Sequence, residues 1–498
     1  MLFKKALLAL GGLLACTVPP RVCALGDVGS ALLVAGGVES ATNDHQPRAS
    51  EAQVAALHNI PLQKQYVPVF RGNKTVAYKT AYFGKVHVGS PESQAFTVVF
   101  DTGSGHFILP STACGSETCA KHRRYNRTES KSAVDIEYDG TLILPDAIER
   151  DQVAIAFGTG EVLGEFVREV VCLDNTPANC VNLRIVLATE MTPDPFGLFA
   201  FDGVLGLGLD ALTLSPGFSF FGQMAAQNPA VQPRFAVFLA RNDDGESMIS
   251  FGGHDERRAS AGLEWAPVAM PELGYWQVQV KSVRIGDTVL EDCADGSCRA
   301  ILDTGTSLLG VPRQAARTMH RLLARQVPND SYSDASEIDC RRVPGTQIHF
   351  DLGGPAVSLS VEDYSRPTPF NMTLPGKNAS GLFCRSLLLP VDMKPPLGPK
   401  VFIWGEPVLR RYYTVYDLAK KQIGFTPAKQ PTDSSTAAGL RAVGAPPLGS
   451  LVSGAPLAAE GAPPLPGAPR PGSVAAEVGG AAEITTAAPA VATAASEA

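Results

Sequence analysis

The sequence predicts an all-β protein built from two copies of one antiparallel unit, on three observations. Asp101-Thr102-Gly103 recurs as Asp303-Thr304-Gly305, each time after an apolar run and with a proline nine residues past the aspartate. Val204-Leu205-Gly206 is matched by Ile403-Trp404-Gly405, and the glycines lie 105 and 102 residues past their aspartates. From Thr80 onward, short apolar runs are broken by Gly, Pro, Asn and Asp, which is typical of strands joined by turns. Matched motifs at matched spacing indicate an internal duplication.

The N-terminal residues 1–24 are expected to be a signal peptide. Lys4-Lys5 precedes the apolar stretch Ala6–Ala15, and Val22-Cys23-Ala24 is a small-residue cleavage site. The apolar stretch is too short to span a bilayer. Leu13-Leu14-Ala15-Cys16 also resembles a bacterial lipid-attachment box, but N-x-S/T sequons favour a eukaryotic secretory protein. These sequons predict glycosylation at Asn73, Asn126, Asn329, Asn371 and Asn378.

Four further segments follow from composition and pattern. Residues 25–70 have no cysteine and little periodicity and are expected to be a propeptide. Two lobes are expected at 71–260 and 261–428, with one clear helix over Pro312–Arg325 because Met319, Leu322 and Leu323 recur at helical spacing. The remaining residues, 429–498, are rich in Ala, Pro and Gly without aromatics, which predicts a disordered tail. Its last residues lack the continuous apolar stretch of a lipid-anchor signal.

The overall charge and composition exclude some classes of partner. A net charge of −7 without a basic cluster argues against nucleic acid, and 45% apolar with 18% charged residues is ordinary for a globular protein. We expect no cofactor and no metal ion. We also expect a monomer without an integral membrane segment once the signal peptide is removed.

The duplicated motifs resemble those of the pepsin-like aspartic proteases, of the cathepsin D and pepsin type. Further segments stand in that family's order from about Ala77 to about Ala428: Phe201–Gly208, Tyr275–Val278, Asp303–Leu309 and Tyr412–Asp417. The resemblance implies a bilobal fold, two pseudo-symmetric antiparallel β lobes with the active site in the cleft between them. It implies an aspartic endopeptidase acting on polypeptide substrates, made as a zymogen.

Two carboxylates held close together suit peptide hydrolysis. Because like charges at short range cannot both ionise readily, one carboxylate acts as base toward water while the other donates a proton to the carbonyl oxygen. Asp101 and Asp303 are the candidates, and Gly103 and Gly305 permit close backbone approach. The resemblance implies that Ser104 and Thr306 hydrogen-bond the outer carboxylate oxygens, and that Thr102 and Thr304 join the two loops.

The resemblance also implies a flap, in which this chain departs from the family. Ala156–Gly160 resembles the flap tip, but Phe157 replaces the usual tyrosine and Ile108 replaces the family's tryptophan, so apolar packing should hold the flap. A phenylalanine flap is similar to that of a branch of the plasmepsin-like proteases. The expected substrate-binding residues are Val99, Phe157, Gly158, Thr159, Phe201 and Val204, with Phe196 as a further wall; they predict a preference for bulky apolar side chains.

Four titratable residues leave alternatives open. Glu406, where the family often has aspartate, either tunes the dyad's pKa or is a surface loop carboxylate. His106 is either a pH sensor or an ordinary loop histidine, and the second reading is preferred. Lys64 or Lys74 could contact the dyad from the propeptide side.

The cysteine spacing predicts disulfides. Of ten cysteines, Cys16 and Cys23 would leave with the signal peptide, so eight remain. By resemblance to the family, Cys114 pairs with Cys119, Cys293 with Cys298 and Cys340 with Cys384, which leaves Cys172 with Cys180. A metal site is the alternative for the close pairs, but His122 beside them does not complete a ligand pattern.

Two functions compete on these residues. The first is an active, acid-optimum endopeptidase of the secretory route, either secreted or in an endolysosomal, vacuolar or secretory organelle. The second is a catalytically silent peptide-binding protein on the same fold, since fold does not fix function. Both aspartates and both glycines are present, which favours the enzyme.

Overall fold

The structure, a computed structural model, describes residues 57–430 apart from 72–73, 145–146, 148–149, 175, 328–337 and 374–379. Every described residue belongs to one compact unit. The predicted signal peptide, the predicted propeptide up to residue 56 and the predicted tail from residue 431 lie outside the described residues.

One large sheet contains the strands of the first half of the chain together with the last strands of the second half. In the described part of the chain this 14-stranded sheet runs β12 (Glu264–Pro267), β26 (Gln422–Pro427), β25 (Tyr412–Asp417), β10 (Gln232–Phe238), β11 (Ser247–Gly252), β1 (His58–Arg71), β2 (Lys74–Val88), β3 (Gln94–Asp101), β9 (Gly203–Gly206), β4 (Phe107–Pro110), β8 (Cys180–Met191), β7 (Gly160–Cys172) and β5 (Val134–Asp135), with β6 (Gln152–Phe157) paired to β7.

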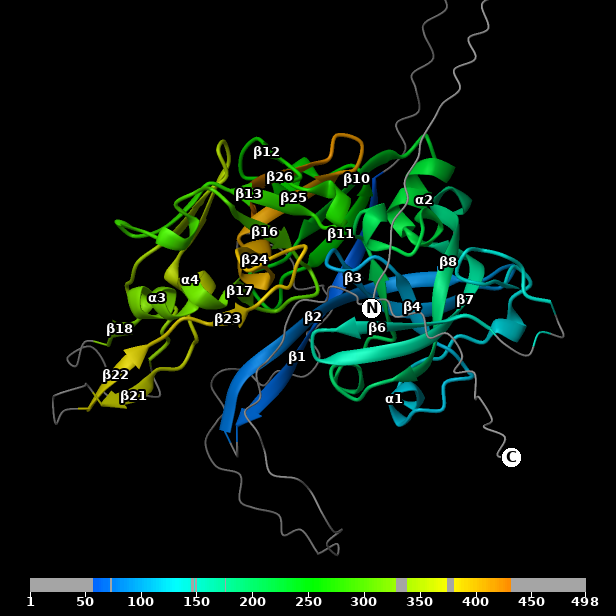
Figure 1. Cartoon of the computed structure of the whole chain (residues 1–498), viewed down its shortest axis with the longest axis horizontal. Helices are drawn as coiled ribbons and strands as arrows, with labels where there is room; N and C mark the ends of the chain where they lie inside the picture. Colours follow the sequence, from blue (N-terminus) through cyan, green and yellow to red (C-terminus); the bar gives the residue numbers. More distant parts are fainter. Residues whose placement is uncertain are drawn as a thin grey trace, which may run out of the picture. The chain divides into compact units, whose positions relative to one another are not determined.

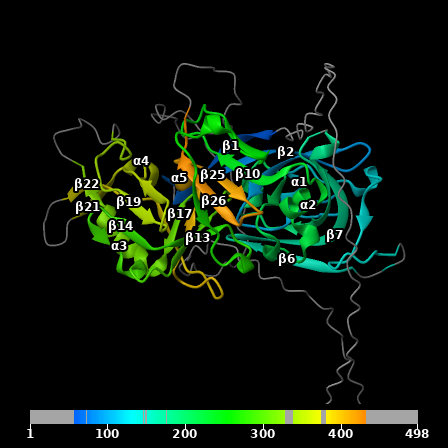
Figure 2. The same cartoon turned by 90° about the horizontal axis from the view of Figure 1, so that it is seen from above.

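Three smaller sheets make up most of the second half. They are β13 (Gln277–Val280), β16 (Cys298–Leu302), β24 (Val401–Trp404), β17 (Leu309–Pro312) and β23 (Leu388–Val391); β15 (Thr288–Val289), β14 (Ser282–Ile285), β19 (Ile348–Asp351) and β20 (Ala356–Leu359); and β18 (Arg325–Gln326), β22 (Ser380–Cys384) and β21 (Phe370–Thr373). Both views show these strands on one side and the blue and cyan strands of the first half on the other (Figures 1 and 2). The predicted all-β, bilobal fold is confirmed.

In the described residues the α-helices are few and short, as the strand-rich pattern predicts. They are α1 (Glu117–Ala120), α2 (Phe220–Gln227), α3 (Arg313–Leu323), α4 (Val361–Tyr364) and α5 (Glu406–Leu409). Helix α3 corresponds to the helix predicted over Pro312–Arg325, and its buried face is Ala315, Ala316, Met319 and Leu323. No helix in the described ranges is long and apolar enough to cross a membrane.

The duplication is visible in the strand pairing. In the first half β3 runs parallel to β9, and β4 runs antiparallel to β9. In the second half β16 runs parallel to β24, and β17 runs antiparallel to β24. Each Asp-Thr-Gly follows the first strand of its set, so the two motifs occupy equivalent places in two equivalent units.

Strand β1 shows that the predicted propeptide, residues 25–70, includes an internal strand of the large sheet. Residues 58–62 pair with β11, and residues 63–71 pair with β2. Ile60, Leu62 and Val67 are buried in the core. The stretch from His58 is therefore integrated into the fold rather than laid over it.

Four disulfides join the cysteine pairs that were predicted. They are Cys114–Cys119, Cys172–Cys180, Cys293–Cys298 and Cys340–Cys384. The second of these links the end of β7 to the start of β8. Of the predicted glycosylation sites, Asn371 is exposed and Asn126 is half-buried, whereas Asn73, Asn329 and Asn378 lie outside the described residues.

Candidate active site

The two aspartates stand at the C-terminal ends of two buried strands, one from each half of the chain. Strand β3 alternates buried and half-buried side chains and then becomes fully buried up to Asp101. Strand β16 is buried over Ala300–Leu302, and Asp303 follows directly. An apolar strand that ends in a carboxylate thus brings that charge into the interior from each half.

The carboxyl groups face each other across the glycines. A Cβ atom added at Gly103 would lie 2.8 Å from the Asp303 Cγ, and one added at Gly305 would lie 2.7 Å from the Asp101 Oδ1. No residue with a side chain fits at either position without displacing a carboxylate. Glycine is therefore required at both places for the two carboxyl groups to approach.

Reciprocal threonine hydrogen bonds hold the two loops together. The Thr102 amide donates to the Thr304 Oγ1 at 3.0 Å, and the Thr304 amide donates to the Thr102 Oγ1 at 3.0 Å. The Thr102 hydroxyl in turn donates to the Leu302 carbonyl at 2.8 Å. Buried bonds of this kind fix the spacing of the loops, because each unpaired group would cost about 1–3 kcal/mol.

Hydrogen bonds to the two carboxylates are unequal. Asp303 accepts from the Thr306 hydroxyl at 2.6 Å and from the Gly305 amide at 2.8 Å, whereas Asp101 accepts from the Gly103 amide at 3.0 Å. The expected bond from Ser104 is not present: its buried Oγ has no hydrogen-bond partner among the described residues. The backbone here is held instead by the Gly208 amide, which donates to the Ser104 carbonyl at 2.9 Å.

The electrostatics of the pair favour a shared proton. Burial and the nearby Asp101 charge raise the pKa of Asp303 well above its ordinary value, despite the opposing bonds from Thr306 and Gly305. A carboxyl whose pKa is raised beside a second carboxyl is the arrangement in which one group stays protonated and the other ionised. The proton belongs to the pair.

The expected substrate-binding side chains come together in one apolar cluster. Val99, Phe201 and Val204 are buried with Phe196 and Phe199, and Phe157 packs against the cluster from the flap. The flap is the β6–β7 hairpin, with Gly158 and Thr159 exposed at its turn. The phenyl rings of Phe157 and Phe196 meet edge to face with centroids 5.3 Å apart.

Ile108, which stands where the family has tryptophan, is buried in the same cluster. Phe157 and Ile108 both lack a polar group, so these two side chains form no hydrogen bond, and ring packing with Phe196 holds Phe157. The neighbouring loop adds polar support, because the Glu161 amide donates to the Thr192 Oγ1 at 3.0 Å.

Tyr275 lies near Asp303 and Asp101, although its motif alone predicts no role for it. It is buried, and burial followed by the charges of Asp303 and Asp101 raises its pKa. Its neighbour Trp276 donates from Nε1 to the Leu207 carbonyl at 2.7 Å. This bond joins the second half to the residue that follows β9, the strand paired with β3. The Tyr275-Trp276 motif does not by itself indicate that it lies near Asp101 and Asp303, because this proximity joins residues far apart in the sequence.

Glu406 is buried, so its interpretation as a surface carboxylate is wrong. It accepts from the Tyr82 hydroxyl at 2.7 Å and pairs with the Lys64 Nζ at 3.2 Å and the Arg410 guanidinium at 3.5 Å. Burial raises its pKa, but Lys64 and Arg410 outweigh burial and hold the pKa below its ordinary value. Lys64 thus meets Glu406 and Asp243 instead of the dyad; the Lys74 side chain lies outside the described residues.

His106 lies in the loop before β4, in line with the preferred interpretation, and its side chain is buried. Its Nε2 accepts from the Leu214 amide at 3.1 Å, and its ring meets Phe218 at a centroid distance of 5.4 Å. Burial lowers its pKa from 6.5 to about 4. The neutral ring is needed, because a protonated Nε2 would be a donor facing a donor.

His106 predicts a pH-dependent loss of stability. Because the folded-state pKa of His106 is depressed, its full contribution to stability is present above about pH 6.5. As the pH falls toward 4, the unfolded chain binds a proton that the folded protein does not, and the free energy of unfolding falls by roughly 3 kcal/mol in total. His106→Gln keeps an acceptor that does not titrate there. Urea unfolding at pH 4 and 6.5 should show a smaller pH difference in the variant; equal differences would exclude this role.

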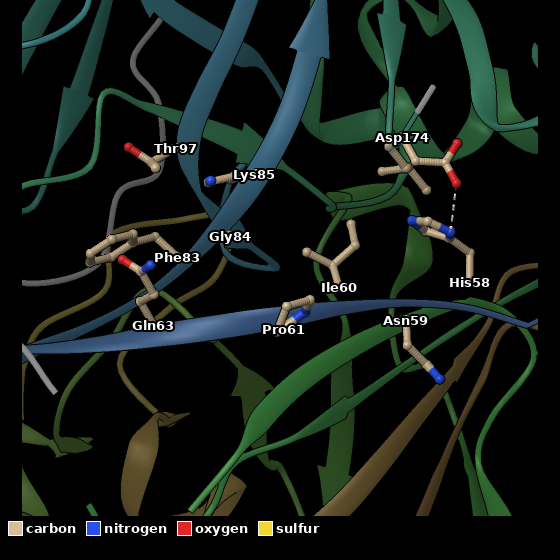
Figure 3. Close-up of a pocket in the computed structure, with 11 residues that line it drawn as sticks. His58, Asn59, Ile60, Pro61, Gln63, Phe83, Gly84, Lys85, Thr97 and Asp174 are labelled. Atoms are coloured by element: carbon tan, nitrogen blue, oxygen red, sulfur yellow. Dashed lines mark ion pairs between the residues drawn. The ribbon is translucent and has the colours of Figure 1, made fainter. Parts of the chain in front are cut away.

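A separate cavity of about 330 Å³ lies under the start of β1, away from the dyad. Its walls include Ile60, Pro61 and Phe83, and neither Asp101 nor Asp303 lines it (Figure 3). At its edge His58 Nδ1 pairs with Asp174 Oδ2 at 3.2 Å, so the loop closed by Cys172–Cys180 holds the beginning of β1.

Comparisons with known proteins agree with this geometry. A family model described as eukaryotic aspartyl protease matches residues 81–428. The chain is similar to cathepsin E of Rattus norvegicus, 31% identical over 353 residues, which cover 70% of this chain and 80% of that protein. It is 30% identical over 387 residues to vacuolar protease A of Neurospora crassa, covering 77% and 84% of the two chains. It is 31% identical over 350 residues to pepsin A of Bos taurus, covering 70% and 84%.

Proposed function

Because the chain belongs to the eukaryotic aspartyl protease family and is an aspartic-type endopeptidase, we propose that Asp101 and Asp303 are its catalytic dyad. The observation that carries this proposal is the mutual approach of the two carboxyl groups across Gly103 and Gly305. The raised pKa of Asp303 beside Asp101 supports it further.

The proposed mechanism uses both protonation states of the pair. The ionised carboxylate takes a proton from a water molecule, whose oxygen attacks the peptide carbonyl carbon, while the protonated carboxyl donates to the carbonyl oxygen. The tetrahedral diol then collapses: one diol hydroxyl gives its proton to the carboxylate that is now ionised, the C–N bond breaks, and the leaving nitrogen receives the proton of the other carboxyl, which restores the singly protonated pair. No covalent enzyme intermediate forms, and Thr306 and the glycine amides hold the carboxylates in place.

The proposed specificity follows from the apolar cluster beside the dyad. Val99, Phe157, Phe201 and Val204 would bind the residue before the cleaved bond, and burial of a bulky apolar side chain there favours binding by about 1.5–3 kcal/mol. A peptide library incubated from pH 3 to 7 should be cut between bulky apolar residues. Cleavage concentrated at basic or acidic residues would contradict this specificity.

Phe201→Ala gives a sharper test of the pocket. Removing the ring should lower kcat/KM for a peptide with Phe before the cleaved bond about tenfold, and change a peptide with Ala there much less. The ratio of the two values corrects for any loss of folded enzyme. An unchanged ratio would place the pocket elsewhere.

The alternative function is a catalytically silent peptide-binding protein. Under that function wild type and Asp303→Asn would both bind apolar peptides and neither would cut them. The intact set of two aspartates, two glycines and the threonine bonds favours hydrolysis, because a silent protein has no need of a shared proton.

We place the enzyme in the secretory pathway, with the compartment unassigned. The support is the predicted signal peptide, the four disulfides, which persist in oxidising compartments, and the similarity to a relative named vacuolar protease A.

A further inference from the structure

The hairpin formed by β1 and β2 extends beyond the sheet to which its base belongs. The base is paired on both sides, with β11 along residues 58–62 and with β3 along residues 83–88. Between these stretches, Gln65–Arg71 and Lys74–Ala81 pair only with each other among the described strands. We call these two stretches the arm; Figure 1 shows them as a blue two-stranded ribbon leaving the body. The family match begins at residue 81, so the arm lies almost wholly outside it.

The arm begins at the floor of the candidate active site. The Thr80 amide donates to the Ser307 Oγ at 2.8 Å, and the Ser307 hydroxyl donates to the Thr80 carbonyl at 2.8 Å. Ser307 lies on the loop that follows Asp303. The backbone groups of Thr80 therefore point away from β1 and toward the catalytic loop of the second half.

The same edge of β2 continues outward without a partner strand. In an antiparallel ribbon, backbone groups two residues apart point the same way, so the Tyr78 amide and carbonyl face the direction that Thr80 faces. Across the ribbon Tyr78 stands opposite Pro68, which has no N–H to offer. An unpaired edge that starts beside a peptide-cleaving site can accept an extended peptide as a further strand.

One face of the arm carries aromatic and apolar side chains in contact with solvent. Tyr66, Pro68 and Phe70 alternate along β1, and Tyr78 lies opposite Pro68, with the Tyr66 and Tyr78 rings 6.1 Å apart. Tyr66 is half-buried, and its hydroxyl donates to Asp243. Phe70 is 64% exposed and Tyr78 is 38% exposed, which is high for such side chains. Exposed apolar groups gathered on one face mark a binding surface.

The other face of the arm joins it to the proposed pocket. Val67 and Ala81 belong to the same apolar cluster as Val99, Phe201 and Val204. Lys79 pairs with Asp194 at 2.9 Å, on the loop that leads to Phe196. Successive side chains of an extended peptide point in opposite directions. The side chain two residues before the one in the pocket therefore points to the same lobe as that residue, toward the base of the arm.

We propose that the arm is an extended subsite, in which the substrate upstream of the cleaved bond adds as a β-strand to the Tyr78–Thr80 edge and contacts Tyr66, Phe70 and Tyr78. This rests on the proposed function of the dyad and its pocket. The occupant is an extended, apolar stretch of polypeptide on the N-terminal side of the bond. The arm thereby selects long unfolded segments over short peptides.

The test compares three peptides with the same cleaved bond. The first covers only the residues next to the bond, the second adds about six residues upstream, enough at ~3.3 Å per residue to pass Tyr78, and the third adds as many downstream. Wild type should cut the upstream-extended peptide with about tenfold higher kcat/KM than the short one, mainly through KM, and gain little from the downstream extension. No gain upstream, or an equal gain downstream, would overturn the proposal.

Variants and a modified peptide locate the gain on the arm. In Phe70→Ser/Tyr78→Ser the ratio of upstream-extended to short peptide should fall to about one, whereas Val289→Ser, which removes an exposed side chain on β15, should keep the wild-type ratio. N-methylation of the backbone amides upstream of the cleaved bond in the extended peptide should remove the gain in kcat/KM. This experiment uses wild-type protein and so does not depend on a variant that folds. A gain that survives both changes would overturn the proposal. Failure of wild type to cut any of the peptides would instead reject the proposed function.

Discussion

Asp303→Asn should lower kcat for peptide cleavage by at least about 10³-fold while leaving the fold intact. The amide is nearly the same size as the carboxyl: its single oxygen can accept from the Gly305 amide, and its NH2 can donate to the Thr306 hydroxyl, which can rotate to accept. It can neither ionise nor donate the proton that the pair must share. Asp101→Asn is the matched variant, and it should be equally inactive because the proton belongs to the pair.

The same substitution should change stability in a pH-dependent direction. The pKa of Asp303 is raised in the folded protein, so the folded state binds more protons than the unfolded chain and stability falls as pH rises above about 4. Asp303→Asn removes this penalty, so the variant should equal or exceed wild type in urea unfolding at pH 7, with the difference shrinking toward pH 4. A variant that is inactive and also destabilised at pH 7 would indicate a structural rather than a catalytic role.

Lys64→Met should lower the free energy of unfolding by about 3 kcal/mol near pH 6, the cost typical of breaking a buried ion pair. The Lys64 side chain is 7% exposed and lies 3.2 Å from Glu406, so its loss leaves a buried carboxylate with less compensation. Lys85→Met is the control, because Lys85 is an exposed lysine on the same hairpin. It should change stability by less than about 0.5 kcal/mol.

The pH dependence and a double-mutant cycle test the origin of that loss. The pKa of Glu406 is held below its ordinary 4.5, so its stabilising contribution is present above that pH and disappears as pH falls through the depressed value. The effect of Lys64→Met should therefore diminish in acid. Combining it with Glu406→Gln should reveal a coupling energy of about 1–3 kcal/mol, and additive effects would show that the two groups do not interact.

The features that could be predicted from the sequence are those whose signal is local or repeated. Asp101 and Asp303 stand in matched motifs at matched spacing, and Cys114 with Cys119 is separated by only a short loop. The all-β architecture follows for the same reason, because strand and turn patterns are read within a few residues.

The features that were missed depend on partners far apart in the chain. Lys64 meets Glu406 across more than three hundred residues, so neither position reveals that the other neutralises it. The weak periodicity of residues 58–71 hid a strand whose neighbours, β2 and β11, include one much later in the chain. The Ser104 hydroxyl has no hydrogen-bond partner among the described residues, whereas the Thr306 hydroxyl donates to Asp303, and matched motifs do not encode this difference.

The most direct measurement of the dyad mechanism is cleavage of one apolar-flanked peptide from pH 3 to 7, with and without pepstatin, by wild type and by the two Asp→Asn variants. Wild type should show a bell-shaped pH profile set by the two apparent pKa values of the pair, pepstatin should abolish cleavage, and both variants should be silent. Cleavage that persists in Asp101→Asn or Asp303→Asn would contradict the assignment of these two carboxylates as the catalytic pair.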